Sequence, residues 1–288
     1  MTRHRIYLAD SRHMPELDDG SVRLVVTSPP YWCLKDYDHP GQIGLGQSYP
    51  EYLDSLAQVM GECYRVLAPG CRLALNIGDQ YLRASEHGRY RVQPIPADLT
   101  LRGQALGFDF MGAILWRKVS TTHTSGGGCL MGSMYYPRDG HITYEHEYIL
   151  LLRKPGAWPR PTPEQKEHSR LSKEERSRWF RGVWDDLPPE RQTGHVAMFP
   201  VELPRRIIRM YSFWGETVLD PFLGSGTTSL AAAGEGRDSV GYEINPAFAS
   251  LIREKLGLGT PGEPLTPARQ VEFLSRPAPP EACAERTE

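Results

Sequence analysis

The amino-acid sequence predicts an α/β fold with a mostly parallel sheet and helices on both of its faces. Short runs of β-branched and aliphatic residues alternate along the chain with amphipathic or alanine-rich segments, as they do in repeated strand-helix units. Glycine- or proline-rich turns follow two of the predicted strands, and ligands bind at the carboxyl ends of strands in open α/β sheets. We therefore expect a ligand site along one edge of the sheet.

Each element is predicted from its local pattern. The segment 49–67 places apolar residues three and four positions apart and has Pro50 near its start, which is typical of an amphipathic helix. Further helices are expected around 97–106 and over 229–233. The β-branched and aliphatic runs predict strands over residues 6–9, 22–26, 72–77, 110–116, 148–152, 217–220 and 239–243.

Composition narrows the class of protein. The chain has 288 residues, 33 basic and 35 acidic side chains and 40% hydrophobic residues, as expected for a globular chain of enzyme size. It has neither a run of roughly 18 apolar residues nor a signal peptide, so we expect a cytoplasmic protein with no membrane contact. The cysteines and histidines lack metal-binding spacing, so no metal is expected.

A rigid polar loop follows the predicted strand 22–26. Two consecutive prolines, Pro29 and Pro30, can continue neither a strand ladder nor a helix. The hydroxyl of Ser28 and the carbonyl of Pro29 could accept hydrogens from an exocyclic amine of cytosine or adenine, and Tyr31 would stack on the base. Preorganised acceptors of this kind would free the lone pair of a poorly nucleophilic amine, so the catalytic residues are expected to be Ser28, Pro29, Pro30 and Tyr31.

A second loop follows the predicted strand 217–220 and leads into an alanine-rich helix. Glycines in this loop let the backbone approach a ligand, and the lack of a lysine argues against a phosphate loop. Glu243 follows Gly224 by 19 positions and ends the next strand, where a carboxylate can bind two ribose hydroxyls. The expected ligand is an adenosine compound with an amino-acid end, bound by Asp220, Pro221, Phe222, Gly224, Ser225, Gly226, Thr227, Thr228 and Glu243.

The two loops together resemble the amino-group DNA methyltransferases of bacterial modification systems, in the permuted order with the catalytic loop first. The segment 27–32, Thr-Ser-Pro-Pro-Tyr-Trp, is similar to their catalytic motif in the serine form typical of cytosine-N4 enzymes, and 220–228 to their S-adenosylmethionine motif. The resemblance covers roughly residues 4 to 256. It implies a Rossmann-like, circularly permuted sheet that is cut between the strands 239–243 and 6–9.

The same resemblance implies further binding residues. It adds Asp10, Phe199 and Asn245 to the cofactor site, and it places target recognition in an insert over 153–195. Residues 153–206 carry 12 basic and 8 acidic side chains, a pattern that also fits a solvated helix. The expected DNA-binding residues are Arg170, Lys173, Arg176, Arg178 and Arg181.

These features divide the chain into four parts. We expect a catalytic half over 1–152, the insert over 153–195, a cofactor-binding half over 196–257 and a proline-rich tail over 258–288 that is either loose or a docking arm. The partners implied are double-stranded DNA, a second copy of the chain and a cognate restriction endonuclease.

The predicted reaction is transfer of the methyl group of S-adenosylmethionine to N4 of a flipped-out cytosine by direct attack. Cytosine-C5 chemistry is excluded, because it needs a cysteine after a proline and no Pro-Cys pair occurs. Adenine N6 remains an alternative, because the serine form correlates imperfectly with the base. Methylation of an amide nitrogen or of RNA, and a non-catalytic DNA-binding specificity subunit, also remain open.

Overall fold

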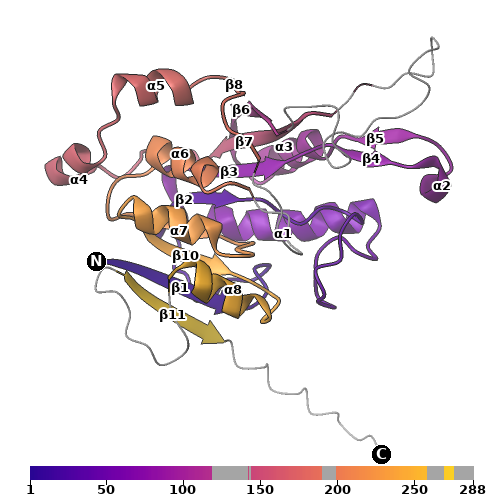
Figure 1. Ribbon diagram of the computed structural model, residues 1–288, viewed down its shortest axis with the longest axis horizontal. Coiled ribbons are helices and arrows are strands. Elements are labelled where there is room, and N and C mark those ends of the chain that lie inside the picture. The colour runs from indigo at the N-terminus through magenta and orange to yellow at the C-terminus, as the bar shows by residue number, and fades with distance from the viewer. Residues whose placement is uncertain (119–141, 143, 190–198, 258–268, 276–288) are drawn as a thin grey trace, which may run out of the picture.

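The computed structural model describes residues 1–118, 142, 144–189, 199–257 and 269–275. These residues form one nine-stranded sheet in the order β11-β1-β10-β9-β2-β3-β7-β6-β8 and one two-stranded sheet, β4-β5 (Figure 1). The strands are β1 (Thr2–Leu8), β2 (Val22–Thr27), β3 (Leu67–Ile77), β4 (Gln80–Leu82), β5 (Arg91–Gln93), β6 (Asp109–Arg117), β7 (His146–Arg153), β8 (Val183–Trp184), β9 (Thr217–Asp220), β10 (Asp238–Tyr242) and β11 (Arg269–Ser275). The helices are α1 (Tyr49–Val66), α2 (Ala84–His87), α3 (Ile95–Ala105), α4 (Pro163–His168), α5 (Lys173–Trp179), α6 (Glu202–Tyr211), α7 (Thr227–Gly234) and α8 (Phe248–Lys255).

The large sheet confirms the predicted α/β class. The six strands from β11 to β3 run parallel to their neighbours, whereas β7 runs antiparallel to both β3 and β6. Helices cover both faces (Figure 1). Successive residues of β2 face opposite sides of the sheet and are buried on both. Val25 packs in the core cluster that contains α1, whereas Leu24 and Val26 pack in the cluster that contains α6 and α7. Each predicted strand and helix overlaps an observed one.

The sheet is continuous across the predicted cut. Strands β10 and β1 lie side by side in parallel, with Tyr242 opposite Tyr7 and the two rings stacked at 5.1 Å between centroids. A strand from near the start of the chain is thus joined directly to one from near its end, as a circular permutation requires.

The expectation of a loose tail is wrong for residues 269–275. These residues form β11, which pairs in parallel with β1 along its whole length. The sequence alternates apolar and polar side chains here, and Val271 and Phe273 pack against a small cluster that contains Ile6 and Ile252. The surrounding prolines obscure this short strand pattern.

Part of the insert packs onto the sheet. Trp179 and Trp184 are buried in the same core cluster as α6, and Trp184 Nε1 donates to the carbonyl oxygen of Trp179 at 2.9 Å. The guanidinium of Arg206 in α6, which is only 2% exposed, pairs with the carboxylate of Asp186 at 2.8 Å. These contacts fix α5 and β8 beside α6.

No helix within the described residues is long and apolar enough to cross a membrane.

Candidate active site

A pocket opens where the parallel strands end. The carboxyl ends of β1, β2, β3 and β10 meet there, together with the start of the antiparallel strand β7, as expected for an open α/β sheet. Ten of the residues predicted from sequence line this one pocket: Asp10, Ser28, Pro29, Pro30, Tyr31, Phe199, Pro221, Phe222, Gly224 and Glu243. The two loops, about 190 positions apart in sequence, thus form a single site, as the hydrogen bond between Thr27 and Asp220 shows directly.

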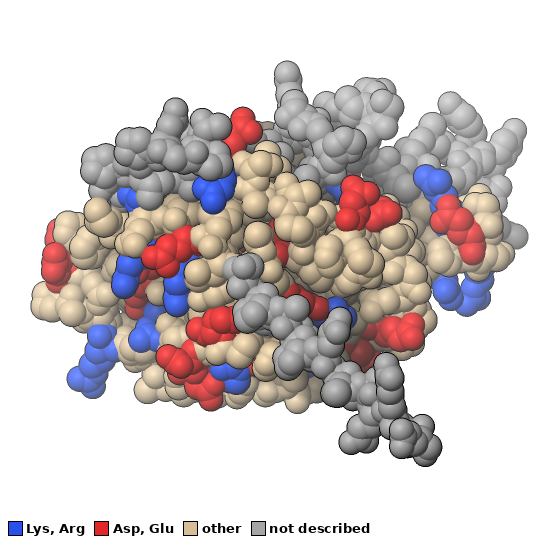
Figure 2. All heavy atoms as spheres, turned by 90° about the horizontal axis from the view of Figure 1, so that it is seen from below, with Lys and Arg blue, Asp and Glu red and all other residues tan. Residues whose placement is uncertain are grey.

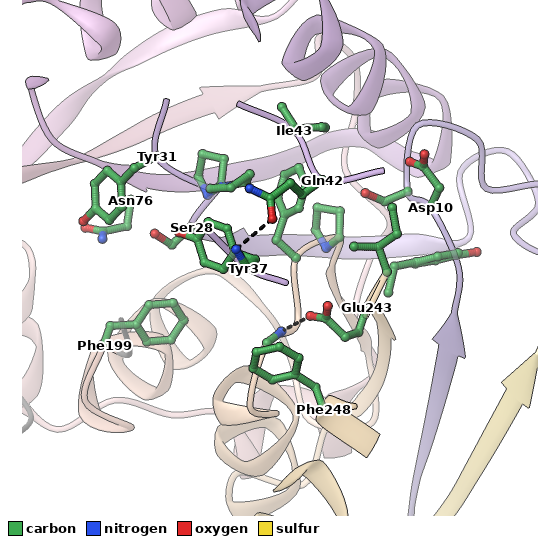
Figure 3. A pocket seen from close by; sticks show the side chains of 18 of the residues that line it. Asp10, Ser28, Tyr31, Tyr37, Gln42, Ile43, Asn76, Phe199, Glu243 and Phe248 are labelled. Carbon is green, nitrogen blue, oxygen red and sulfur yellow. Dashed lines mark hydrogen bonds between the residues drawn. The ribbon is translucent and has the colours of Figure 1, made fainter. Parts of the chain in front are cut away.

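Glu243 lies at one end of the pocket (Figure 3). Its two carboxylate oxygens accept hydrogen bonds from the backbone N–H groups of Gly224 and Asn245, both at 2.9 Å. Burial raises the pKa of Glu243 to about 7 despite these bonds. A largely buried carboxylate in a pocket that is also lined by Phe222 and Phe248 fits an adenosine, because ribose hydroxyls can bind the carboxylate and the flat base can pack on apolar side chains.

Asp220 lies behind the pocket and joins the two loops. Its carboxylate is 2% exposed and accepts hydrogen bonds from the hydroxyls of Thr27 at 2.7 Å and Thr228 at 2.6 Å, and from the backbone N–H of Phe222 at 3.0 Å. Burial raises its pKa to about 6. The geometry assigns Asp220 to holding the catalytic strand against the cofactor loop.

The rest of the glycine loop also supports the site from behind. Gly226 precedes α7 with a φ of 88°, a left-handed conformation that favours glycine. Lys255 in α8 donates to the hydroxyls of Ser225 at 2.7 Å and Thr227 at 2.8 Å. These contacts shape the loop from which Gly224 reaches the pocket.

Three residues implied by the resemblance have distinct surroundings. Asp10 accepts hydrogen bonds from the backbone N–H and the guanidinium of Arg12, a residue that the sequence reasoning missed. The Asn245 side chain donates to the carbonyl oxygen of Tyr37 at 2.9 Å and so holds the loop that follows the catalytic motif. Phe199 lies on the Ser28 side of the pocket, whereas Asp10 lies on the side of Glu243 (Figure 3).

A buried polar cluster at the Ser28 end was not predicted. Glu147, which is 6% exposed, accepts hydrogen bonds from the Tyr31 hydroxyl at 2.5 Å, the Lys118 ammonium at 2.6 Å and the Asn76 amide at 2.7 Å. Burial, followed by the nearby Glu147 carboxylate, raises the pKa of Tyr31 well above its usual value of 10. The phenol is therefore neutral and donates, which fixes the position of its ring.

The same cluster leaves one acceptor for a ligand. Within the described residues, the side-chain carbonyl oxygen of Asn76 is buried and has no hydrogen-bond partner, and Asn76 lines the pocket. A buried acceptor of this kind fits a ligand that brings an N–H group. The sequence signal was the position of Asn76 at the end of a predicted strand, at the same sheet edge as Ser28.

Comparison with known proteins identifies the family. The profile of the N6/N4 DNA methylases matches residues 22–254. The chain belongs to the N6/N4 DNA methylase family.

Individual relatives agree with this assignment. The methylase is 36% identical to the type II methyltransferase M.MjaI of Methanocaldococcus jannaschii, over 89% of its own chain and 92% of that relative. TTHA0409 from Thermus thermophilus is described as a DNA modification methylase, in a structure complexed with S-adenosyl-L-methionine. Its sequence is 40% identical to this chain, and the match covers 94% of this chain and 98% of that chain with a TM-score of 0.75. The PvuII DNA methyltransferase, which is cytosine-N4-specific, shares the fold at 20% identity with a TM-score of 0.63, over 88% of this chain and 87% of its own.

The methylase therefore has a Rossmann-like fold, uses S-adenosylmethionine and modifies amino groups in DNA. Residues that would fit this cofactor line the pocket, since a largely buried carboxylate and apolar side chains at the Glu243 end are suited to a ribose and an adenine. Among the described residues, no group of three or more histidine, cysteine or acidic side chains is arranged to hold a metal ion.

The five basic residues predicted in the insert do not line the pocket of the methylase. Arg170 pairs with Glu167 at 3.6 Å, Arg178 with Asp186, and Arg181 with Asp185 at 3.8 Å. Lys173 and Arg176 are exposed and form no ion pair with any described residue, although Arg176 lies 4.4 Å from the centre of the Phe180 ring.

Proposed function

We propose that this methylase transfers the methyl group of S-adenosylmethionine to the exocyclic N4 of cytosine in double-stranded DNA. The observation that carries the proposal is the position of Ser28, in the catalytic loop, in the same pocket as the cofactor carboxylate Glu243. The serine form of the loop favours cytosine over adenine.

The pocket offers several acceptors to an amine. The Ser28 hydroxyl, the Pro29 carbonyl and the free Asn76 carbonyl oxygen can bind the amine hydrogens and favour a tetrahedral nitrogen with an available lone pair. Such acceptors act only if they are held in advance, and the prolines and the Glu147–Asn76 hydrogen bond hold them. Bound S-adenosylmethionine supplies an electrophilic methyl group. The N4 lone pair forms the new N–C bond as the S–C bond breaks, and N4 releases one proton along its hydrogen bond toward Ser28 and then to water.

The target base has to leave the duplex to reach this pocket, at a cost of a few kcal/mol for unstacking and unpairing. Stacking on the Tyr31 ring offsets part of that cost. Because the Tyr31 hydroxyl is bound to Glu147, the ring is already oriented before the base arrives.

The reaction is tested by identifying the methylated nucleoside. Purified protein is incubated with labelled S-adenosylmethionine and DNA that lacks this modification, and the DNA is digested to nucleosides. We expect labelled N4-methylcytosine. Labelled N6-methyladenine without N4-methylcytosine would refute the choice of base, and label found only in protein or RNA would refute DNA as the substrate. A protein that fails to bind S-adenosylmethionine in calorimetry would support a non-catalytic specificity subunit.

The Ser28→Ala variant tests the catalytic loop. We expect turnover to fall by about 100-fold, because mutagenesis of one preorganised polar group typically costs this much. Cofactor affinity should stay near the wild-type value, because Ser28 lies at the other end of the pocket from Glu243. Equal losses of turnover and cofactor binding would contradict a catalytic role.

We also propose that the insert over 153–195 contributes to target recognition, that two copies of the chain form a homodimer, and that a cognate restriction endonuclease recognises the same DNA sequence. Exposed Lys173 and Arg176 in α5 support the first, and the type II methyltransferase relatives support the last.

A further inference from the structure

Residues 80–93 form a separate projection that we call the arm. It consists of β4, α2 and β5, and its two strands pair antiparallel with each other and not with the large sheet. The arm leaves the sheet directly after β3, four positions beyond Asn76 of the pocket wall. It extends past the strand ends on the right of Figure 1.

The base of the arm is attached to the catalytic loop. Gln80, which is 1% exposed, donates its side-chain N–H to the Cys33 sulfur at 3.1 Å, and the His87 ring lies 6.0 Å from the ring of Trp32. Both partners follow Tyr31 within two positions. The arm is therefore held at a fixed place beside the pocket, on the side where the catalytic loop lies.

The exposed surface of the arm is basic. It carries Arg83, Arg89 and Arg91 against a single acid, Glu86, so 3 − 1 gives a charge of +2. Arg83 pairs with Glu86 at 3.9 Å. No described residue forms an ion pair or hydrogen bond with the guanidinium of Arg89 or Arg91, and both side chains are exposed. This differs from the insert, where three of the five predicted arginine and lysine residues already pair with carboxylates.

An aromatic pair stiffens this surface. The ring of Tyr90 is 59% exposed and stacks on Tyr81 at 5.9 Å between centroids, with 17° between the ring planes. Tyr90 stands between Arg89 and Arg91 in the segment that leads into β5, and all three side chains are exposed. Because the hairpin is short and anchored, its backbone is already ordered. Its unpaired arginines can therefore bind a neighbouring polyanion with little loss of backbone conformational entropy.

We propose that the arm binds the sugar-phosphate backbone of duplex DNA beside the nucleotide that enters the pocket. Arginine donates to phosphate oxygens in a bidentate manner, and most protein-DNA hydrogen bonds of this kind set the position of the duplex rather than read its sequence. The proposal rests on the proposed function, since it assumes that duplex DNA approaches the pocket. It assigns to the arm the contacts that hold the duplex while one base is turned out.

The test compares two double variants with the wild type. The arm variant is Arg89→Ala with Arg91→Ala. The matched control is Arg3→Ala with Arg5→Ala, which also removes two arginines, but at the start of β1, on the side of the sheet where the parallel strands begin, away from the pocket. Affinity is measured by fluorescence anisotropy at several salt concentrations, with a short duplex that the wild type methylates. S-adenosylmethionine binding, measured by calorimetry, reports on folding.

We expect the arm variant to bind the duplex more weakly and the slope of log affinity against log salt to fall by about 2, because two phosphate contacts each contribute about 0.9. Cofactor binding should not change, and the control should keep the wild-type slope. An arm variant with the wild-type slope, or a control with the same loss, would overturn the proposal while leaving the methylation reaction in place. A wild type that neither binds nor methylates duplex DNA would instead overturn the proposed function.

Discussion

Glu243 makes cofactor binding sensitive to pH near neutrality. Burial raises the pKa of this carboxyl to about 7, so a large fraction is protonated in the empty protein at neutral pH. The proposed ligand carries a sulfonium charge and two ribose hydroxyls, and both favour the ionised carboxylate. Binding of the cofactor should therefore release a proton from Glu243.

We expect the affinity for S-adenosylmethionine to increase as the pH rises through about 7, since this is the pKa at which Glu243 ionises. Calorimetry on both sides of this pH measures the change. The Glu243→Gln variant should bind more weakly above the pKa and lose most of the pH dependence. A glutamine variant with the wild-type pH profile would show that another group controls binding.

The hydroxyl of Tyr31 provides a second test at the scale of single residues. Tyr31→Phe keeps the stacking ring but removes the hydrogen bond to Glu147, which is 2.5 Å long and involves a charged acceptor. Such bonds contribute roughly 1.5–3 kcal/mol, so we expect kcat/KM for DNA to fall by about 10-fold or more. Cofactor affinity should be unchanged.

A matched control is Tyr64→Phe, in which the altered ring packs edge-on against Phe108 in the core. It should keep the wild-type kcat/KM. If Tyr31→Phe were as active as this control, the hydroxyl anchor would have no part in placing the base.

The individual elements show what could be predicted from the sequence. Helix α1 and strands β2 and β9 have strong local patterns, and the loops after the two strands carry the catalytic and cofactor residues within a few positions. Glu147 could not be found in this way, because no local pattern distinguishes an acidic residue at the start of an apolar strand. It reaches the pocket only because β7 runs antiparallel and brings its start to the edge where the other strands end.

The arm and β11 escaped prediction for a different reason. The strands of the arm have three residues each and α2 has four, too short to show a periodic pattern. Their stability comes from contacts distant in sequence, such as the bond from Gln80 to Cys33. Local propensity carries little information about such elements.

Helix α5 is the part of the insert in which DNA contact can be tested. Removing Lys173 and Arg176 together should weaken duplex binding and reduce its salt dependence, because neither residue has an acidic partner among the described residues. Replacing Arg181, which already lies 3.8 Å from Asp185, should have a smaller effect. Anisotropy titrations measure all three proteins. Wild-type binding by the double variant would remove α5 from the DNA contacts.

Strand β11 should stabilise the fold. A chain that ends after residue 257 loses Val271 and Phe273 from the cluster around Ile6 and exposes the edge of β1. We expect its free energy of unfolding to fall by about 2 kcal/mol, given the value of burying part of two apolar side chains. A chain that ends after residue 275 keeps β11 and should match the full chain in thermal unfolding. Equal stability of both truncated chains would show that β11 contributes little.

For the whole molecule, the charge is an average that hides local differences. The formal net charge is −2, and acidic and basic side chains are interspersed on the face seen in Figure 2. A DNA-binding role therefore depends on small regions such as the arm. Global charge is a poor guide to a polyanionic partner in a protein of this kind.

Association of two chains is a further prediction for the whole molecule. Large apolar side chains are exposed on α3 and the adjacent strand β6, with Leu101 65%, Phe110 41% and Met111 42% exposed. Such residues are candidates for an interface between copies. We expect light scattering to give the mass of a dimer, and Leu101→Asp with Phe110→Asp to shift it to that of a monomer. A monomer mass for the wild type across a concentration series would contradict this.

The position of β1 in the sheet also determines when the protein can fold during its synthesis. Residues 2–8 leave the ribosome before their partners in the sheet, β10 and β11, have been made. One edge of strand β2 likewise stays unpaired until β9 has been made. The nascent chain must therefore keep three strand edges, both edges of β1 and one edge of β2, unpaired until β9, β10 and β11 have been made, and unpaired edges of this kind are prone to misassembly.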